Sequence, residues 1–334
     1  MTKPNMTLVD NTKTKAHEEA AGSFQRSPRF MNGEGFNSTF KWLSICSAMF
    51  ILVILGGFFV SLTMGAWPAI SKFGLSFIWT STWNPVTEQF GALPAIAGTL
   101  ITSGIAIVLA VPLAFAIAIY ITQLAPRWLR HPLGIAIELL AAIPSIIYGM
   151  WGLFFFAPVF AEYVQEPVIN AFENVPFLSS IFAGPAIGIG MATAGIVLAI
   201  MILPFIAAVM RDVIDTVPKR LKESGYAVGA TDWEVTRAII IPHCKTAMTG
   251  AIFLGLGRAL GETMAVTFIV GNANRITGAI FAPGNTIAST IANEFQEAYT
   301  EIHSSSLIAL GLLLFIITFI VLAIARLMLN RISS

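Results

Sequence analysis

Apolar residues along the chain gather in six long runs, which polar segments separate. A run of about 20 helical residues crosses the roughly 30 Å hydrocarbon core of a bilayer. The pattern therefore predicts an all-α polytopic membrane protein with six transmembrane helices. The predicted spans are Trp42–Thr63, Ala95–Ile121, Gly134–Phe156, Ala186–Met210, Ala247–Gly271 and Ser306–Ala325.

Composition supports this class of protein. The chain has 334 residues, of which 56% are hydrophobic and 11% are charged, whereas a soluble domain carries about 25% charged residues. The two cysteines, Cys46 and Cys244, indicate neither a disulfide framework nor a metal cluster. The four histidines are dispersed and lack the spacing of metal ligands. We therefore expect no metal and no cofactor.

Lysine and arginine are divided unevenly between the two sides that six spans define. Of the 19 lysines and arginines, Lys72 and Arg275 lie on one side, and Arg258 lies within a span. The other 16 lie on the side of the two termini. Cytoplasmic segments carry the excess of these residues, so both termini and the segment between spans four and five are predicted to be cytoplasmic. Residues 1–40 are polar and lack an apolar period, which indicates a disordered tail.

The segment Arg211–Lys245, between the fourth and fifth spans, carries signals for two short helices around a tight turn. Pro218 suits the first turn of a helix, where its missing N–H is not needed. Gly229 permits the left-handed conformation that ends a helix. Thr231 and Glu234 have the spacing of a capping box, which predicts the start of the second helix.

Pro242 is expected to end this second helix, because the residue before a proline is disfavoured in helical conformation. The predicted helix pair offers apolar surface at Trp233 and Ile239 and charge at Glu223 and Arg237. Two interpretations follow from the residues alone. The pair is an ordinary amphipathic element on the membrane surface, or it is a docking surface for another protein.

The predicted fifth span contains two charged residues, Arg258 and Glu262. An arginine at the centre of a span costs about 2.5–3.5 kcal/mol on insertion scales. The two residues are four apart, so on a continuous helix they share a face and can form an ion pair. Either this pair fixes helix packing, or Arg258 offers its planar set of donors to an oxyanion and Glu262 orients it.

The polar segment resembles the EAA motif of ABC-importer permeases, on Glu223, Gly229, Ile239 and Pro242. Ser224 and Gly225 stand where the motif has two alanines, and Ile241 stands where it has leucine. The resemblance implies a type I ABC-importer permease with a cytoplasmic coupling helix that fits a groove in a separate ATPase subunit. The coupling residues that it implies are Glu223, Gly229, Thr231, Glu234, Ile239 and Pro242.

A second stretch, from Gly257 to Asn272, is similar to the permeases of oxyanion importers, and Thr263-Met-Ala-Val is similar to those of the phosphate-specific transport system. The stretch Glu138–Gly149 also resembles that family. The resemblance implies a substrate path at Arg258, Glu262 and Thr263. Sulfate or molybdate is the alternative substrate, and a secondary anion transporter is the alternative class.

The chain has no Gly-x-x-x-x-Gly-Lys-Ser/Thr motif, so it lacks a P-loop for ATP. We expect a non-catalytic subunit. The resemblance implies a heterodimer with a paralogous permease, two copies of an ATP-binding subunit and a periplasmic phosphate-binding protein, in the bacterial inner membrane and without nucleic acid. We expect a tail at 1–40, a first span with an external segment at 41–90, a permease domain at 91–326 and a cytoplasmic C-terminus at 327–334.

Overall fold

The computed structural model describes residues 33–333, with side chains from 38 to 327. Most of the expected tail lies outside the described residues, but residues 33–40 already belong to the first helix. The chain divides into two units, residues 1–60 and 61–334, and each is described by itself. Helix α2 (Gly33–Phe73) passes from the first unit into the second, and its residues 38–60 are exposed to the surroundings.

The described chain is helical, and an isolated bridge between Asn84 and Gln89 is the only extended pairing within residues 33–333. After α2, the elements in chain order are α3 (Ser76–Trp79), α4 (Leu93–Ile119), η1 (Tyr120–Leu124), α5 (Arg127–Ala142), α6 (Ser145–Trp151), η2 (Gly152–Phe156), α7 (Ala157–Phe160), η3 (Ala161–Gln165), α8 (Glu166–Phe172), α9 (Pro176–Ile181), α10 (Met191–Asp215), α11 (Lys219–Ala227), α12 (Asp232–Val235), η4 (Thr236–Ile240), α13 (Ile241–Leu260), α14 (Met264–Ile269), α15 (Ile287–Glu294), η5 (Phe295–Glu297) and α16 (Glu301–Ser333).

Within the described residues, six helical segments are long and apolar enough to cross a membrane, so the predicted number of spans is confirmed. They are Ser38–Phe73, Leu93–Leu124, Ser145–Phe172, Met191–Asp215, Asp232–Leu260 and Glu301–Leu327. All six differ from the prediction in their ends, and the third and fifth differ most. In the third the reason is a break in the helix, and in the fifth it is a break at one end and a continuation at the other.

The third predicted span, Gly134–Phe156, is wrong because the chain breaks at Ile143 and Pro144, whose backbones are extended. Proline lacks an N–H and clashes with the preceding turn, so α5 ends at Ala142 and α6 starts anew. Because Pro144 has no N–H to give, the carbonyl of Leu140 keeps only a long hydrogen bond from the N–H of Ile143, at 3.4 Å. The hydroxyl of Tyr148 donates to that carbonyl at 2.9 Å and holds the two helices together across the break.

Helix α10 forms the centre of the second unit, where it packs against α4, α5, α13 and α14. Its side chains at Leu198, Ile202 and Ile206 are fully buried. Helix α4 faces it with alanines four residues apart, which are Ala106, Ala110, Ala114 and Ala118 and are also fully buried. Small residues allow helix backbones to approach closely where lipid gives no hydrophobic driving force. This close packing makes α4 and α10 the frame on which α13, the helix that carries Arg258, is packed.

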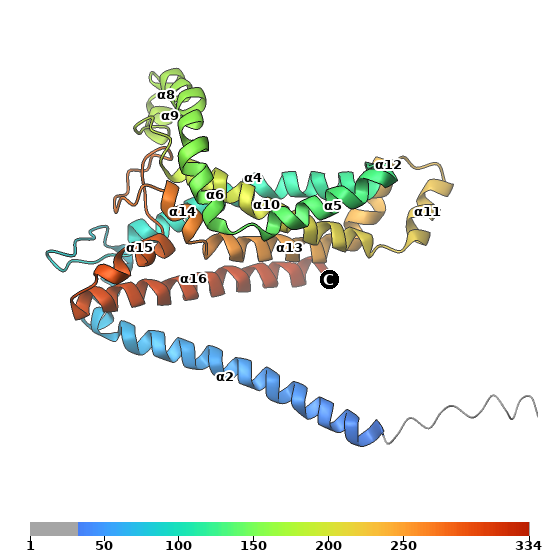
Figure 1. Ribbon diagram of the computed structural model, residues 1–334, viewed down its shortest axis with the longest axis horizontal. Coiled ribbons are helices and arrows are strands. Elements are labelled where there is room, and N and C mark those ends of the chain that lie inside the picture. Colours follow the sequence, from blue (N-terminus) through green and yellow to red (C-terminus); the bar gives the residue numbers. More distant parts are fainter. Residues whose placement is uncertain (1–32, 334) are drawn as a thin grey trace, which may run out of the picture. The chain divides into compact units, whose positions relative to one another are not determined.

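Figure 1 shows α4, α10 and α13 running alongside one another in this unit. Helices α8 and α9 lie at one end of the bundle, and α11 lies at the opposite end. The long segment Asp232–Leu260 runs from the α11 end toward α14, so it joins the predicted coupling residues to the predicted substrate path.

Candidate functional site

The predicted fifth span, Ala247–Gly271, is interrupted at Gly261. Helix α13 ends at Leu260, and Gly261 donates its N–H to the carbonyl of Gly257 at 3.4 Å. The short helix α14 then begins at Met264. Gly261 has φ of −93° and ψ of 2°, which depart from the α-helical backbone and end the helix. The two helix ends therefore meet at a break that carries all three predicted path residues.

Arg258 lies in the last turn of α13 and is half-buried. Its guanidinium carbon lies 5.4 Å from the centre of the Phe205 ring, which is within range of a cation–π interaction. The carboxyl end of a helix favours a positive charge, so the surroundings stabilise Arg258 without a carboxylate.

Glu262 does not pair with Arg258, so the prediction that the two share a helix face is wrong. Among the side chains that the structure describes, the ion pairs include neither residue. Glu262 follows the helix end, where its Oε1 accepts the N–H of Ala265 at 3.2 Å. It thus satisfies one of the free N–H groups at the start of α14. The guanidinium of Arg258 keeps donors available for an anion.

Thr263 directly precedes α14, and its carbonyl accepts both the N–H and the hydroxyl of Thr267, at 3.0 and 2.7 Å. Helix α14 also packs tightly on α6, because a Cβ added to Gly149 would lie 2.9 Å from the Cα of Ala265. Two contacts in this region were not predicted from the sequence. They are the contact of Arg258 with Phe205 and the hydrogen bond from the Tyr148 hydroxyl to the carbonyl of Leu140. Tyr148 lies within the Glu138–Gly149 stretch that carries the resemblance, and that was its only signal.

A polar network fixes the other end of α14. Asn272, which has a left-handed backbone with φ of 51°, donates to the carbonyl of Thr267 at 3.2 Å and accepts the hydroxyl of Ser289 at 2.6 Å. Farther out, Glu294 accepts from the Trp83 indole at 2.7 Å and lies 2.9 Å from His303 Nε2. These contacts tie α14, α15 and α16 together. They could not be predicted from the spacing of residues along the chain.

The predicted helix pair is present at the opposite end of the bundle (Figure 1). Pro218 precedes α11, and Gly229 follows it with φ of +87°, as the prediction required. The predicted capping box is also confirmed. The N–H of Thr231 donates to Glu234 Oε2 at 2.8 Å, and the N–H of Glu234 donates to Thr231 Oγ1 at 3.4 Å.

The prediction that Pro242 ends the second helix is wrong. The helix continues from Asp232 to Leu260, because the turn Thr236–Ile240 is a π-helix. In this wider turn the N–H of Ile241 donates to the carbonyl of Thr236, five residues earlier. The wider turn makes room for a proline that has no N–H to give. The predicted coupling residues Ile239 and Pro242 therefore lie on the same continuous helix as Arg258.

Gly225, which departs from the motif, lies where α11 packs on this helix. A Cβ at this position would be 2.7 Å from Ile239 Cδ1 and 3.0 Å from Val235 Cγ2. We expect Gly225→Ala to be tolerated, because the terminal methyl group of Ile239 can turn aside and alanine favours helix by about 1 kcal/mol over glycine. We expect Gly225→Val to separate α11 from the second helix, because its two methyl groups exceed this space.

Hydrogen–deuterium exchange of the α11 amides measures both variants. Gly225→Ala is expected to keep the exchange rates of the original chain, and Gly225→Val is expected to raise them. Equal protection in the two variants would show that the close contact with Ile239 does not hold α11 in place.

The capping box gives a second prediction. Thr231→Ala removes the hydroxyl that accepts the Glu234 N–H and is expected to cost about 1 kcal/mol of helix stability. Amides at the start of the second helix should then exchange about fivefold faster. Thr249→Ala is the matched control, because the Thr249 hydroxyl donates to the carbonyl of Lys245 within a helix and caps nothing. Similar effects of the two changes would contradict the assignment.

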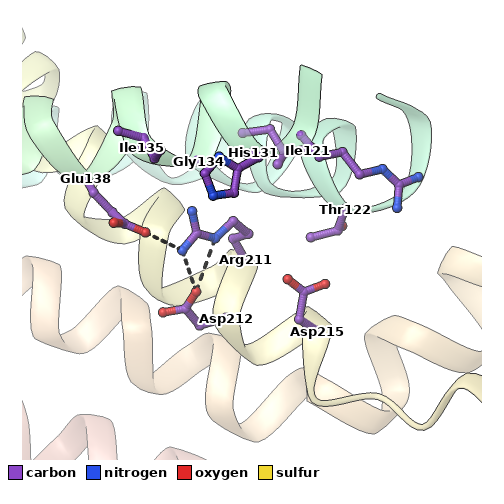
Figure 2. Close-up of a pocket in the computed structure, with 10 residues that line it drawn as sticks. Ile121, Thr122, His131, Gly134, Ile135, Glu138, Arg211, Asp212 and Asp215 are labelled. Atoms are coloured by element: carbon purple, nitrogen blue, oxygen red, sulfur yellow. Dashed lines mark hydrogen bonds and ion pairs between the residues drawn. The ribbon is translucent and has the colours of Figure 1, made fainter. Parts of the chain in front are cut away.

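A pocket of about 430 Å³ lies between α5 and α10 near this end (Figure 2). Figure 2 shows Arg211 pointing toward Glu138 and Asp212, and its Nη2 lies 2.7 and 2.8 Å from their carboxylates. A Cβ on Gly134 would be 2.5 Å from Arg211 Nη1, so this glycine admits the arginine. Glu138 is therefore the partner of Arg211, which lies near the end of α10 that leads to α11.

These features define a class of protein. Six spans, one of which continues as a single helix into an ordered surface element, are typical of an ABC-importer permease, and solved structures show the same fold. The inward-facing MetNI methionine ABC transporter has a TM-score of 0.52 at 16% identity, over 78% of this chain and 100% of that chain. A bacterial alginate ABC transporter, in complex with an alginate-bound periplasmic protein, has a TM-score of 0.55 at 16% identity, over 89% and 97%.

The sequence family described as the inner membrane component of binding-protein-dependent transport systems matches residues 110–334. The chain belongs to this family. It is 57% identical to the phosphate transport system permease protein PstC of Mesorhizobium japonicum, over 86% of this chain and 88% of that protein. It is 51% identical to PstC of Haemophilus influenzae, over 92% and 98%. It is 36% identical to PstC 1 of Mycobacterium tuberculosis, over 88% and 93%.

Proposed function

We propose that this chain is the permease subunit of an ATP-driven importer of inorganic phosphate. The observation that carries the proposal is the similarity, over most of its length, to permeases named for phosphate transport. The half-buried Arg258 without a carboxylate partner fits this substrate, because a guanidinium binds the oxygens of phosphate through paired hydrogen bonds.

The substrate path runs past Arg258, Glu262 and Thr263. Arg258 supplies charge and donors to the passing anion. Glu262 holds the start of α14 and places a negative charge beside the path, which favours release. Thr263 lies between the two helix ends, where a small shift of α13 relative to α14 opens or closes the break. These roles are supported by the positions of the three residues at a single interruption of one span.

Coupling to ATP occurs at the opposite end, through Glu223, Gly229, Thr231, Glu234, Ile239 and Pro242. Helix α11 and the start of the second helix present the surface that a separate ATPase subunit contacts. Closure of the ATPase pushes this surface, and the continuous helix Asp232–Leu260 transmits the push to Arg258. The span then changes the side from which phosphate reaches the path, which is alternating access.

The assembly that fits this role is a heterodimer with a paralogous permease, two ATP-binding subunits and a periplasmic phosphate-binding protein. The chain lies in the bacterial inner membrane with both termini and the coupling segment in the cytoplasm. The excess of lysine and arginine on that side supports this orientation.

Competition between oxyanions in the reconstituted importer tests the function. Vesicles that contain the complex and its binding protein should accumulate labelled phosphate only when ATP is present on the side of the membrane where the ATPase subunits lie. Unlabelled phosphate should compete, and equal concentrations of sulfate or molybdate should not. Preferential competition by sulfate or molybdate would assign that substrate instead. Uptake that persists without ATP would indicate a secondary transporter.

A further inference from the structure

A cavity of about 420 Å³ lies beside the pocket of Figure 2, between the turn before α5 and helix α11. The two share Thr122, Arg130 and Asp215 as lining residues. The cavity lies at the α11 end of the bundle, at the far end of the long helix from the break that carries Arg258. It is therefore separate from the proposed substrate path.

Four cations line this cavity, namely Arg127, Arg130, Lys219 and Lys222, and two carboxylates accompany them, namely Asp215 and Glu223. None of the four cations forms an ion pair within the part of the chain whose side chains are described. The lining therefore has a surplus of two positive charges, which a doubly charged anion would balance.

Two of the cations are held in place by backbone carbonyls. Arg130 Nε donates to the carbonyl of Ala125 at 2.8 Å, and its Nη2 donates to that of Gln123 at 3.2 Å. Lys222 Nζ lies 3.5 Å from the carbonyl of Ile214. Each group keeps further N–H donors for a ligand. The cations are thus positioned, yet their charge is not neutralised.

Lys222 is the half-buried member of the four cations, whereas Arg127, Arg130 and Lys219 are exposed. Burial of the Lys222 ammonium lowers its pKa; Asp215 opposes this change, and Arg130 and Lys219 reinforce it. Gln123 also lines the cavity, and its Nε2 is buried without an acceptor. An unpaired buried donor loses its hydrogen bonds to water. An anion in the cavity would stabilise the charged form of Lys222.

We propose that this cavity binds a phosphate group. Arginine and lysine together recognise phosphate, arginine through its planar fork and lysine as a point charge. The phosphate group comes from free inorganic phosphate or from the headgroup of an anionic phospholipid. Since Glu223 of the coupling segment lines the same cavity, occupancy acts on the element that contacts the ATPase. The site does not depend on which anion the importer carries.

The test uses the assembled importer without its soluble binding protein, with Arg258→Gln to disable the substrate path. It is placed in nanodiscs of phosphatidylcholine, with or without phosphatidylglycerol. Binding of labelled inorganic phosphate and retention of phospholipid are both measured. Lys219→Gln with Lys222→Gln is expected to weaken phosphate binding about tenfold or more. Lys245→Gln, which removes an exposed cation outside the cavity, is the matched control.

If the double variant loses phosphate binding and the Lys245→Gln control keeps it, the result supports a site for the free anion. Loss of retained phosphatidylglycerol in that variant, without free phosphate binding, supports a headgroup site. In the chain with both lysines intact, the ligand should also slow acylation of Lys222 relative to Lys245, and this measurement does not require the variant to fold. Equal binding and retention in all variants, or Lys222 acylation that neither phosphate nor phosphatidylglycerol slows, would overturn the proposal.

Discussion

Replacing Arg258 with glutamine is expected to reduce phosphate uptake by about tenfold to a hundredfold, because a hydrogen bond to a charged group contributes about 1.5–3 kcal/mol. The complex should still assemble. Arg258 forms no ion pair among the described side chains, and the contact that the change gives up is the cation–π interaction with Phe205. Uptake of labelled phosphate and size-exclusion chromatography of the complex measure the two effects. Arg326→Gln, which removes an exposed arginine on α16, is the control.

Glu262→Gln distinguishes the two roles that a carboxylate at this break can have. The amide keeps an oxygen that accepts the N–H of Ala265, so the start of α14 is expected to remain intact. If Glu262 only caps α14, uptake stays close to that of the original chain. If its charge drives release of phosphate, uptake falls while phosphate binding tightens.

The Arg258→Gln prediction has its own contradicting outcome. Normal uptake in the Arg258→Gln chain would remove Arg258 from the substrate path.

Glu223→Lys combined with Gly229→Pro is expected to release the ATPase subunit from the complex. Proline fixes φ near −65°, whereas Gly229 has φ of +87°, so the turn cannot form. Proline also removes the N–H that Gly229 donates to the carbonyl of Tyr226 at 3.0 Å. The charge reversal at Glu223 then opposes the remaining contact with the partner subunit.

Co-purification of the ATPase with the tagged permease measures this effect. Gly278→Pro is the matched control, since Gly278 also has a positive φ, of 67°, but follows α14, far along the chain from the coupling segment. Full recovery of the ATPase with the double variant would show that the subunit binds elsewhere on the permease.

Local chemistry could be predicted from the sequence, and long-range packing could not. The capping box of Thr231 and Glu234 and the left-handed Gly229 depend on residues within one turn, and all were predicted. The break at Pro144 interrupts a span that was predicted as continuous, and its closure by Tyr148 could not be foreseen because it joins residues on two helices. The number of spans followed from apolar length alone, whereas their ends did not.

The two errors at the site have one origin. Arg258 and Glu262 were expected to pair because a helix was assumed to continue through Gly261, and the structure ends it there. Pro242 was expected to end a helix that in fact continues, because a π-helical turn precedes it. In both cases the local preference of Gly or Pro was known, but the surrounding packing decided whether the helix stopped.

The π-helical turn Thr236–Ile240 also sets the rotational phase between the two ends of the span. One residue of an α-helix corresponds to about 100° of rotation and 1.5 Å of rise. The wider turn takes up one residue more than an α-helical turn, so the segments on either side keep nearly the phase of a helix that is one residue shorter. One residue inserted elsewhere between Thr231 and Arg258, in ordinary α-helix, would rotate the Thr231 end by about 100° relative to Arg258. Such a chain would keep every predicted coupling residue and every predicted path residue. It would present them out of phase, so that ATPase binding and phosphate movement become disconnected.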